Sequence, residues 1–100
     1  MNLISLYYFT ELAKELHVTN TSQRLYISQQ NLTQHIQRLE QHYGVLLFVR
    51  KPKLALTYAG EQLLIAANKI LAEETELINR LSNISKTGAG RLRVGIPSYR

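Results

Sequence analysis

The fold of this 100-residue chain is decided by residues 19–43, which read TNTSQRLYISQQNLTQHIQRLEQHY. The segment opens with Thr19-Asn20-Thr21, a cluster of side chains that favour a helix N-terminus, and it predicts a short helix ending near Leu25. Tyr26-Ile27 interrupts the helical pattern, and Ser28 is a good cap for a second helix. The sequence therefore predicts two helices joined by a tight turn.

The second of these helices, residues 28–43, is predicted to be amphipathic. Apolar side chains at helical spacing share one face of it: Leu32, Ile36, Leu39 and Tyr43. The core-facing stripe consists of Leu32, Ile36 and Leu39. The opposite face carries hydrogen-bonding side chains: Ser28, Gln29, Gln30, Asn31, Thr33, Gln34, Gln37 and Arg38. Amides bond adenine bidentately and threonine contacts the thymine methyl group, so this face favours half-sites that contain A·T pairs. The pattern is typical of a DNA-binding helix-turn-helix, although a merely solvated helix has a similar face.

The flanking segments complete a small domain. Before the helix pair, apolar residues spaced by three and four predict a helix over about residues 3–16. After it, Gly44 is a suitable left-handed stop for the second helix. The apolar runs 45–49 and 54–56 then predict two short strands of a hairpin.

The tip of this hairpin, residues 50–54, is basic. Arg50, Lys51 and Lys53 surround Pro52 there. A basic turn alone is more often a solvated loop, but beside a helix-turn-helix it predicts a wing that contacts phosphates. The expected fold class is mainly α: a winged helix-turn-helix followed by a long dimerisation helix.

Thr57 is a capping residue in front of that long helix, which is predicted over residues 58–87. Apolar residues recur along it in two series of period seven, with two more in the gaps: Leu63, Ile70, Leu77 and Ile84; Leu64, Leu71 and Ile78; Ala67 and Leu81. Such a stripe favours pairing with a second copy through Leu63, Leu64, Ala67, Ile70, Leu71, Leu77, Ile78 and Leu81. The alternative is a helix packed against its own domain.

Composition narrows the possible functions. The chain has no cysteine and no aspartate, which excludes disulfide frameworks, thiol nucleophiles, zinc ribbons and Asp-dependent calcium or catalytic sites. His35 and His42 lie seven residues apart, too far for a shared metal, and are expected to be solvated or at the edge of a DNA groove. We expect no enzymatic activity and no cofactor or metal in this segment.

The net charge of +5 is unevenly distributed. Residues 1–57 carry six basic and three acidic side chains, residues 58–87 three basic and four acidic, and residues 88–100 three arginines and no acid. A basic balance favours nucleic acid as the partner. No apolar run approaches the roughly 20 residues of a membrane span, and no signal peptide is evident, so we expect a cytoplasmic protein without a membrane partner.

Several motifs together resemble the LysR-type transcriptional regulators. They are, in chain order, Met1-Asn2-Leu3, Leu6, Tyr8-Phe9, residues 24–29, Leu32-Thr33, Ile36, Arg38-Leu39-Glu40, Tyr43-Gly44-Val45, and residues 47–50, 56–60 and 90–95. The resemblance covers nearly the whole chain and implies three parts. These are a DNA-binding domain (1–57), a linker helix for dimerisation (58–87), and a hinge with the first strand of a truncated effector-binding domain (88–100).

Carried over position by position, the resemblance implies two sets of DNA contacts. The base-reading side chains would be Gln29, Gln30, Thr33 and Gln34. The phosphate contacts would be Thr19, Asn20, Ser28, Arg38, Arg50 and Lys53. It further implies a homodimer on double-stranded DNA at the bacterial nucleoid, possibly a tetramer at full length, and a small-molecule effector for the missing domain.

The chain departs from the family's usual pattern within the helix-turn-helix. Thr21-Ser22 replaces an Ala-Ala pair, Gln30-Asn31 replaces Pro-Ala, and Gln34 stands where arginine is common. These departures affect the contact list rather than the fold. Three functions stay open: sequence-specific duplex binding, a coiled-coil interaction module with incidental basicity and, remotely, an enzyme.

Overall fold

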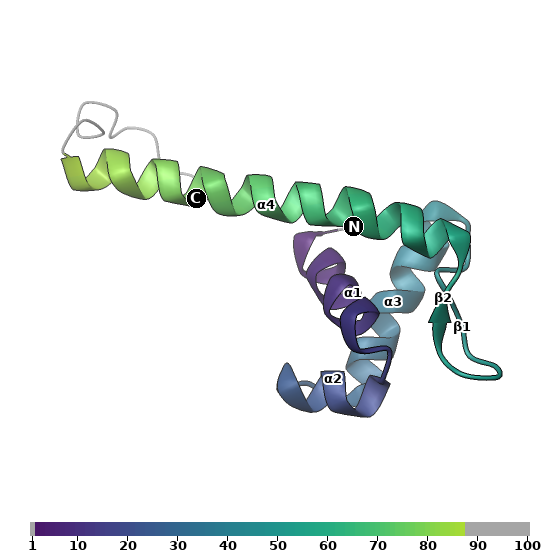
Figure 1. Ribbon diagram of the computed structural model, residues 1–100. Helices are drawn as coiled ribbons and strands as arrows, with labels where there is room; N and C mark the ends of the chain where they lie inside the picture. The colour runs from purple at the N-terminus through teal and green to yellow at the C-terminus, as the bar shows by residue number, and fades with distance from the viewer. Residues whose placement is uncertain (1, 88–100) are drawn as a thin grey trace.

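The computed structural model describes residues 2–87. Its elements are α1 (Leu3–Glu15), α2 (Val18–Arg24), α3 (Gln29–Tyr43), β1 (Phe48–Val49), β2 (Ala55–Leu56) and α4 (Tyr58–Thr87). Helices α1 to α3 and the hairpin form a body, and α4 lies across the top of it and continues well beyond (Figure 1). The predicted mainly helical, winged helix-turn-helix fold with a long following helix is confirmed. The predicted hinge and strand at 88–100 lie outside the described residues.

Helix α1 supplies the centre of the core. The side chain of Asn2 caps its first turn by accepting the N–H of Ser5 at 3.1 Å. Leu6, Phe9 and Leu12 are buried, because their spacing places them on the face that meets the other helices. Packing of this stripe against α2, α3 and α4 fixes the body as one unit.

Helix α2 begins slightly earlier than the sequence predicts. Leu16 adopts a left-handed conformation (φ 53°) that turns the chain after α1 and leaves His17 at the cap position. The Nδ1 atom of His17 accepts the N–H of Asn20 at 3.1 Å. The cap is therefore an imidazole, and the capping role predicted for Thr19-Asn20-Thr21 is wrong.

Helix α3 follows the predicted pattern over most of its length. Ser28 caps it, with Oγ accepting the N–H of Asn31 at 2.9 Å, and Gly44 ends it in a left-handed conformation (φ 72°). The stripe residues that the structure buries are Leu32, Ile36 and Leu39. Tyr43 shares their spacing but is 41% exposed, because it lies in the last turn at the edge of the core.

The hairpin is short and antiparallel. Its register pairs Phe48 with Leu56 and Val49 with Ala55. The predicted first strand, residues 45–49, is longer than the strand observed. Leu46 is 65% exposed, and the N–H of Leu47 is bonded to the Glu40 carboxylate at 2.9 Å instead of to a partner strand. The end of α3 thus takes up a backbone donor that a longer strand would use.

Leu47 also joins the hairpin to the start of α4. Its carbonyl oxygen accepts the N–H of Thr57 at 3.0 Å. Thr57 caps α4 as predicted, its Oγ1 accepting the N–H of Gly60 at 2.9 Å. A Cβ at Gly60 would lie 2.2 Å from the Leu47 oxygen, so only glycine allows this close approach of helix and loop.

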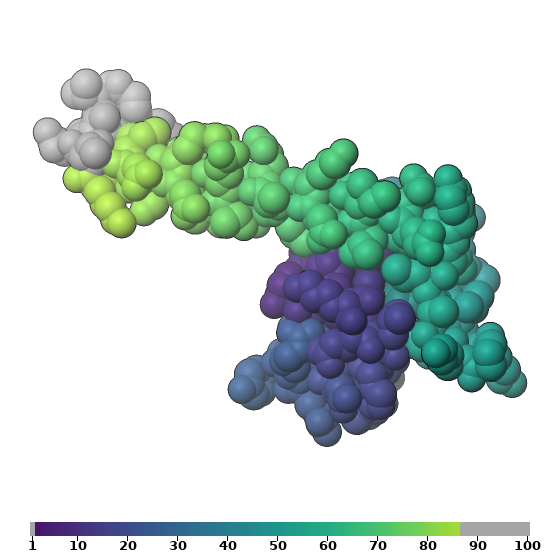
Figure 2. All heavy atoms as spheres, in the orientation of Figure 1, coloured from purple at the N-terminus to yellow at the C-terminus, as the bar shows by residue number. Residues whose placement is uncertain are grey.

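Helix α4 lies in two environments. In its first half, Leu63 and Leu64 pack against the core and Ala67 is fully buried in it. Its second half extends clear of the body, as the space-filling view shows (Figure 2). Although α4 is long, none of the helices in residues 2–87 is apolar enough over a sufficient length to cross a lipid bilayer.

Candidate nucleic-acid interface

The start of α3 presents polar side chains to solvent. Gln29, Gln30 and Gln34 are exposed, and Thr33 is half-buried where α3 faces the hairpin. None of these four side chains, which we call the recognition face, belongs to the buried stripe. The stripe therefore fixes the helix while the recognition face stays accessible, which is what insertion into a major groove requires.

One histidine helps to orient α3. Nδ1 of His35 lies 2.8 Å from the Ser5 hydroxyl of α1, and its ring packs edge-on against Tyr8 with centroids 4.8 Å apart. Burial lowers the pKa of His35, and the charge of Arg38 lowers it further. His35 is thus half-buried in the contact between α1 and α3, so the solvated position is wrong, and a position at the edge of a DNA groove stays a prediction. In residues 2–87, no three metal-binding side chains come together.

The predicted phosphate-contacting residues occur on three elements. Thr19 and Asn20 open α2, Ser28 and Arg38 belong to α3 and its cap, and Arg50 and Lys53 lie on the hairpin tip; Thr19 is half-buried and the others are exposed. Over the described range, the three cations of this set take part in no ion pair. Their charges therefore face solvent, where an anionic partner can reach them.

Arg24 serves the fold instead. Its guanidinium bonds Glu11 through Nη1 at 2.7 Å and Glu15 through Nε, which ties α2 to α1. Glu11 also accepts from Lys14 at 2.9 Å. Burial alone would raise the pKa of Glu11, but the hydrogen bonds from Lys14 and Arg24 hold it below its ordinary value. The only sequence signal for this clamp is the spacing of Glu11 and Glu15 on one helix face.

The apolar stripe of α4 is divided between the two environments. The exposed fractions of its outer residues are 42% for Ile70, 45% for Leu77, 54% for Ile78, 56% for Leu81 and 43% for Ile84. Leu71 is half-buried near α1. Ala67 has no exposed surface, so a predicted dimer contact there is wrong. The alternative expectation, packing against its own domain, therefore holds for the first half of α4 only.

Comparison with known proteins agrees with this geometry. Residues 3–61 match the model of the family described as bacterial regulatory helix-turn-helix protein, lysR family. This chain belongs to the LysR family. The resemblance seen in its motifs is thereby confirmed, and the family consists of regulators rather than enzymes.

Curated LysR relatives match most of the chain. It is 39% identical over 99 residues to the regulator BudR of Klebsiella aerogenes, covering 98% of this chain and 69% of BudR. It is 35% identical over 90 residues to XapR of Escherichia coli (strain K12), covering 89% of this chain. The chain spans 31% of the length of XapR and 30% of that of YraN of Bacillus subtilis (strain 168).

Solved LysR-type structures share the fold. A complex of the BenM DNA-binding domain with catB site 1 DNA matches with a TM-score of 0.81 and 28% identity, covering 85% of this chain and 96% of the BenM chain. Full-length OxyR C199D from Pseudomonas aeruginosa matches with a TM-score of 0.75 and 36% identity, covering 86% of this chain and 29% of OxyR. The first of these structures contains DNA bound to that protein.

Thr21 and Ser22, which replace the usual LysR alanines, differ in the hydrogen bonding of their hydroxyls. Ser22 donates its hydroxyl proton to the Thr19 carbonyl at 3.0 Å, as expected for a hydroxyl satisfied by its own helix. Thr21 is fully buried, and its Oγ1 has no hydrogen-bond partner within residues 2–87. An unpartnered buried hydroxyl costs about 1–3 kcal/mol, so Thr21 lowers the stability of the body relative to an alanine at this position.

Proposed function

We propose that this chain is the DNA-binding and dimerisation segment of a LysR-type transcriptional regulator that acts on duplex DNA in the bacterial cytoplasm. The observation that carries the proposal is the recognition face, held by a buried stripe and flanked by a basic hairpin. An α-helix with such a face fits the major groove. The DNA-bound BenM domain, which has the same fold, supports this placement.

In this proposal, the contacts divide into two classes. Gln29, Gln30, Thr33 and Gln34 read base edges, and the amides favour half-sites that contain A·T pairs. Thr19, Asn20, Ser28, Arg38, Arg50 and Lys53 contact phosphates and fix the register of the domain on the duplex. The hydroxyl of Ser28 can donate to a phosphate oxygen while its lone pair caps α3.

We further propose that the exposed half of α4 pairs with a second copy. Five large apolar side chains between Ile70 and Ile84 remain 42–56% exposed, an arrangement that favours burial by a partner helix. A dimer places two recognition faces on successive turns of the duplex. In the whole protein, residues 88–100 would begin an effector-binding domain, and that domain would bind a small molecule. A tetramer would be a further assembly of the whole protein.

A salt titration tests the DNA-binding proposal. Duplexes are selected from a random library with the unmodified chain, and their affinity is measured against salt concentration. Each phosphate contact contributes a slope of about −0.9 in log affinity against log salt. Replacing Arg38, Arg50 and Lys53 together by glutamine should therefore flatten the slope by about 2.7.

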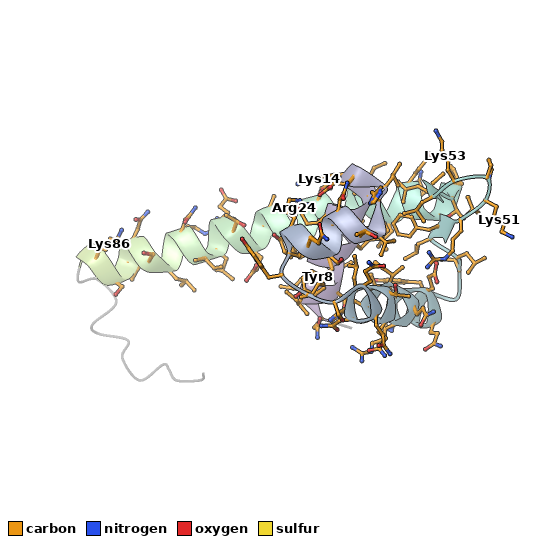
Figure 3. The ribbon with its side chains drawn as sticks, turned by 90° about the horizontal axis from the view of Figure 1, so that it is seen from below. Tyr8, Lys14, Arg24, Lys51, Lys53 and Lys86 are labelled. Atoms are coloured by element: carbon orange, nitrogen blue, oxygen red, sulfur yellow. The ribbon has the colours of Figure 1, made fainter. Side chains whose placement is uncertain are left out.

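The control for this titration is Lys86→Gln, which removes one positive charge at the far end of α4 (Figure 3) and should leave the slope unchanged. If the affinity of the unmodified chain did not change with salt concentration, the DNA-binding proposal would be wrong. That result would favour an interaction module whose basicity is incidental.

Base reading is tested by Gln29→Ala. We expect a loss of about 1–3 kcal/mol on the selected site and relaxed preference at one base pair, because one side chain reads one position. Gln62→Ala, an exposed amide on α4, should change neither quantity. If Gln29→Ala left the ranking of selected sites untouched, Gln29 would not read a base.

A further inference from the structure

One carboxylate interrupts the apolar stripe of α4. Glu74 lies seven residues after Ala67 and seven before Leu81, on the same face of the helix. The four residues one turn away from it on this face are all apolar: Ile70, Leu71, Leu77 and Ile78. No cation of α4 therefore lies at a spacing that brings it beside the Glu74 carboxylate.

The body supplies no cation to Glu74 either. The side chain lies in a groove of about 280 Å³ between α4 and the first turns of α1. The α1 side of this groove consists of Leu3, Ile4 and Tyr7. Within residues 72–86, Glu74 is the only half-buried side chain, and over the part of the chain that the structure describes it forms no ion pair. Glu74 thus carries a charge into mostly apolar surroundings without a compensating partner.

A second copy of α4 is the partner that the stripe fits. Glu73 and Arg80 lie seven residues apart along one border of the stripe, so the same helix from another copy can present each of them with the opposite charge. Burial of the exposed Leu77 and Leu81 favours the pairing. Glu74 lies one turn before Leu77 on the same face, so a copy that covers Leu77 also covers Glu74.

We propose that Glu74 limits the self-association of this chain. The inference rests on the proposed pairing of α4 and names the residue that sets its strength. Each pairing removes two Glu74 carboxylates from water, one from each copy, and burial of an unpartnered carboxylate is unfavourable. A single polar side chain in such a seam lowers the stability of the helix pair. Glu74 therefore keeps the pair in exchange with the monomer at concentrations where an uninterrupted stripe would hold two copies together.

Analytical ultracentrifugation of single variants tests this assignment. Glu74→Gln, which removes the charge but keeps the shape of the side chain, should tighten self-association at least about tenfold, and Glu74→Leu should tighten it further. Glu73→Gln is the matched control, because Glu73 is exposed and lies beside Arg80; it should leave the association unchanged or weaken it. If Glu74→Gln changed the association less than twofold or weakened it, or if Glu73→Gln tightened it equally, Glu74 would not be the limiting residue.

A double variant shows whether the gain depends on the stripe. Adding Leu81→Arg to Glu74→Gln should abolish the tighter association, because the second change places an ion on the same exposed stripe. A double variant that associated as tightly as Glu74→Gln would overturn the proposal, since the copies would then meet on another surface. If neither the unmodified chain nor Glu74→Leu associated at any concentration while both remained folded in thermal unfolding, the proposed pairing itself would be wrong.

Discussion

The two halves of α4 have the same heptad pattern but opposite surroundings. In the first half, Leu63, Leu64 and Ala67 pack into the body, whereas in the second half Leu77 and Leu81 remain 45% and 56% exposed. At 1.5 Å per residue, the 30 residues of α4 span about 45 Å, more than the body covers. An apolar stripe therefore shows how much surface a helix must bury, but the size of its own domain decides how much is left for a partner.

The largest effect should come from a charge in the buried half. Ala67→Glu places a carboxylate where the side chain has no exposed surface, and we expect it to lower the free energy of unfolding by more than about 3 kcal/mol. Chemical denaturation measures this loss. Ala66→Glu, at the exposed neighbouring position, should cost less than about 0.5 kcal/mol; equal losses for both variants would contradict the division of α4.

A charge in the second half of α4, the half that projects beyond the body, should instead break the proposed dimer. Leu81→Arg should weaken self-association at least about tenfold, because it places an ion on the exposed stripe, while the melting temperature of the dilute monomer stays the same. Analytical ultracentrifugation follows the association. Ser82→Arg, an equal change of charge off the stripe, is the control, and a similar loss with that variant would assign the effect to charge alone.

Acidification should lower the free energy of unfolding of the body, because Glu11 lies there and not in the projecting half. The folded-state pKa of Glu11 lies below its ordinary value, so its stabilising contribution is present above that ordinary value and is lost as the pH falls through the folded-state pKa. Glu11→Gln should cost about 1–2 kcal/mol near neutral pH and flatten the acid limb of the stability curve. Thermal unfolding across that range measures both effects, and Glu76→Gln should reproduce neither.

The smallest effect should come from the ion pairs of the projecting half. The Arg80 guanidinium lies 3.5 Å from Glu76 and 3.9 Å from Glu73, and its side chain is 55% exposed. Exposed pairs of this kind contribute little, so Arg80→Ala should change the stability of the dilute monomer by less than about 0.5 kcal/mol. A loss as large as that of Glu11→Gln would mean that the projecting half is folded against something in the monomer.

Local chemistry made much of the fold predictable. Ser28, Gly44 and Thr57 each act through hydrogen bonds or backbone angles within their own turn, and all three lie where the sequence predicts. The stripe of Leu32, Ile36 and Leu39 was predictable for a similar reason, because helical spacing alone places the three side chains on one face.

The features that were missed depend on contacts between distant segments. Arg24 counts as a basic residue in the sequence, but it belongs to a clamp with Glu11 and Glu15 that forms only when α2 meets α1. His35 looks solvated until Ser5 and Tyr8 are brought against it. For the same reason, the accessibility of the recognition face was predictable, but the groove that Thr33 lines together with hairpin residues was not, because spacing along one helix says nothing of where the hairpin lies.

The position of Leu47 has a mechanical consequence. Its N–H donates to the Glu40 carboxylate of α3, and its carbonyl oxygen accepts the N–H of Thr57, the cap of α4. Gly60 lies close to that oxygen. The end of the helix that carries the recognition face and the beginning of α4 are therefore joined through the backbone of one residue. Together with the burial of Ala67 in the core, this link ties the direction of α4 to that of the recognition helix.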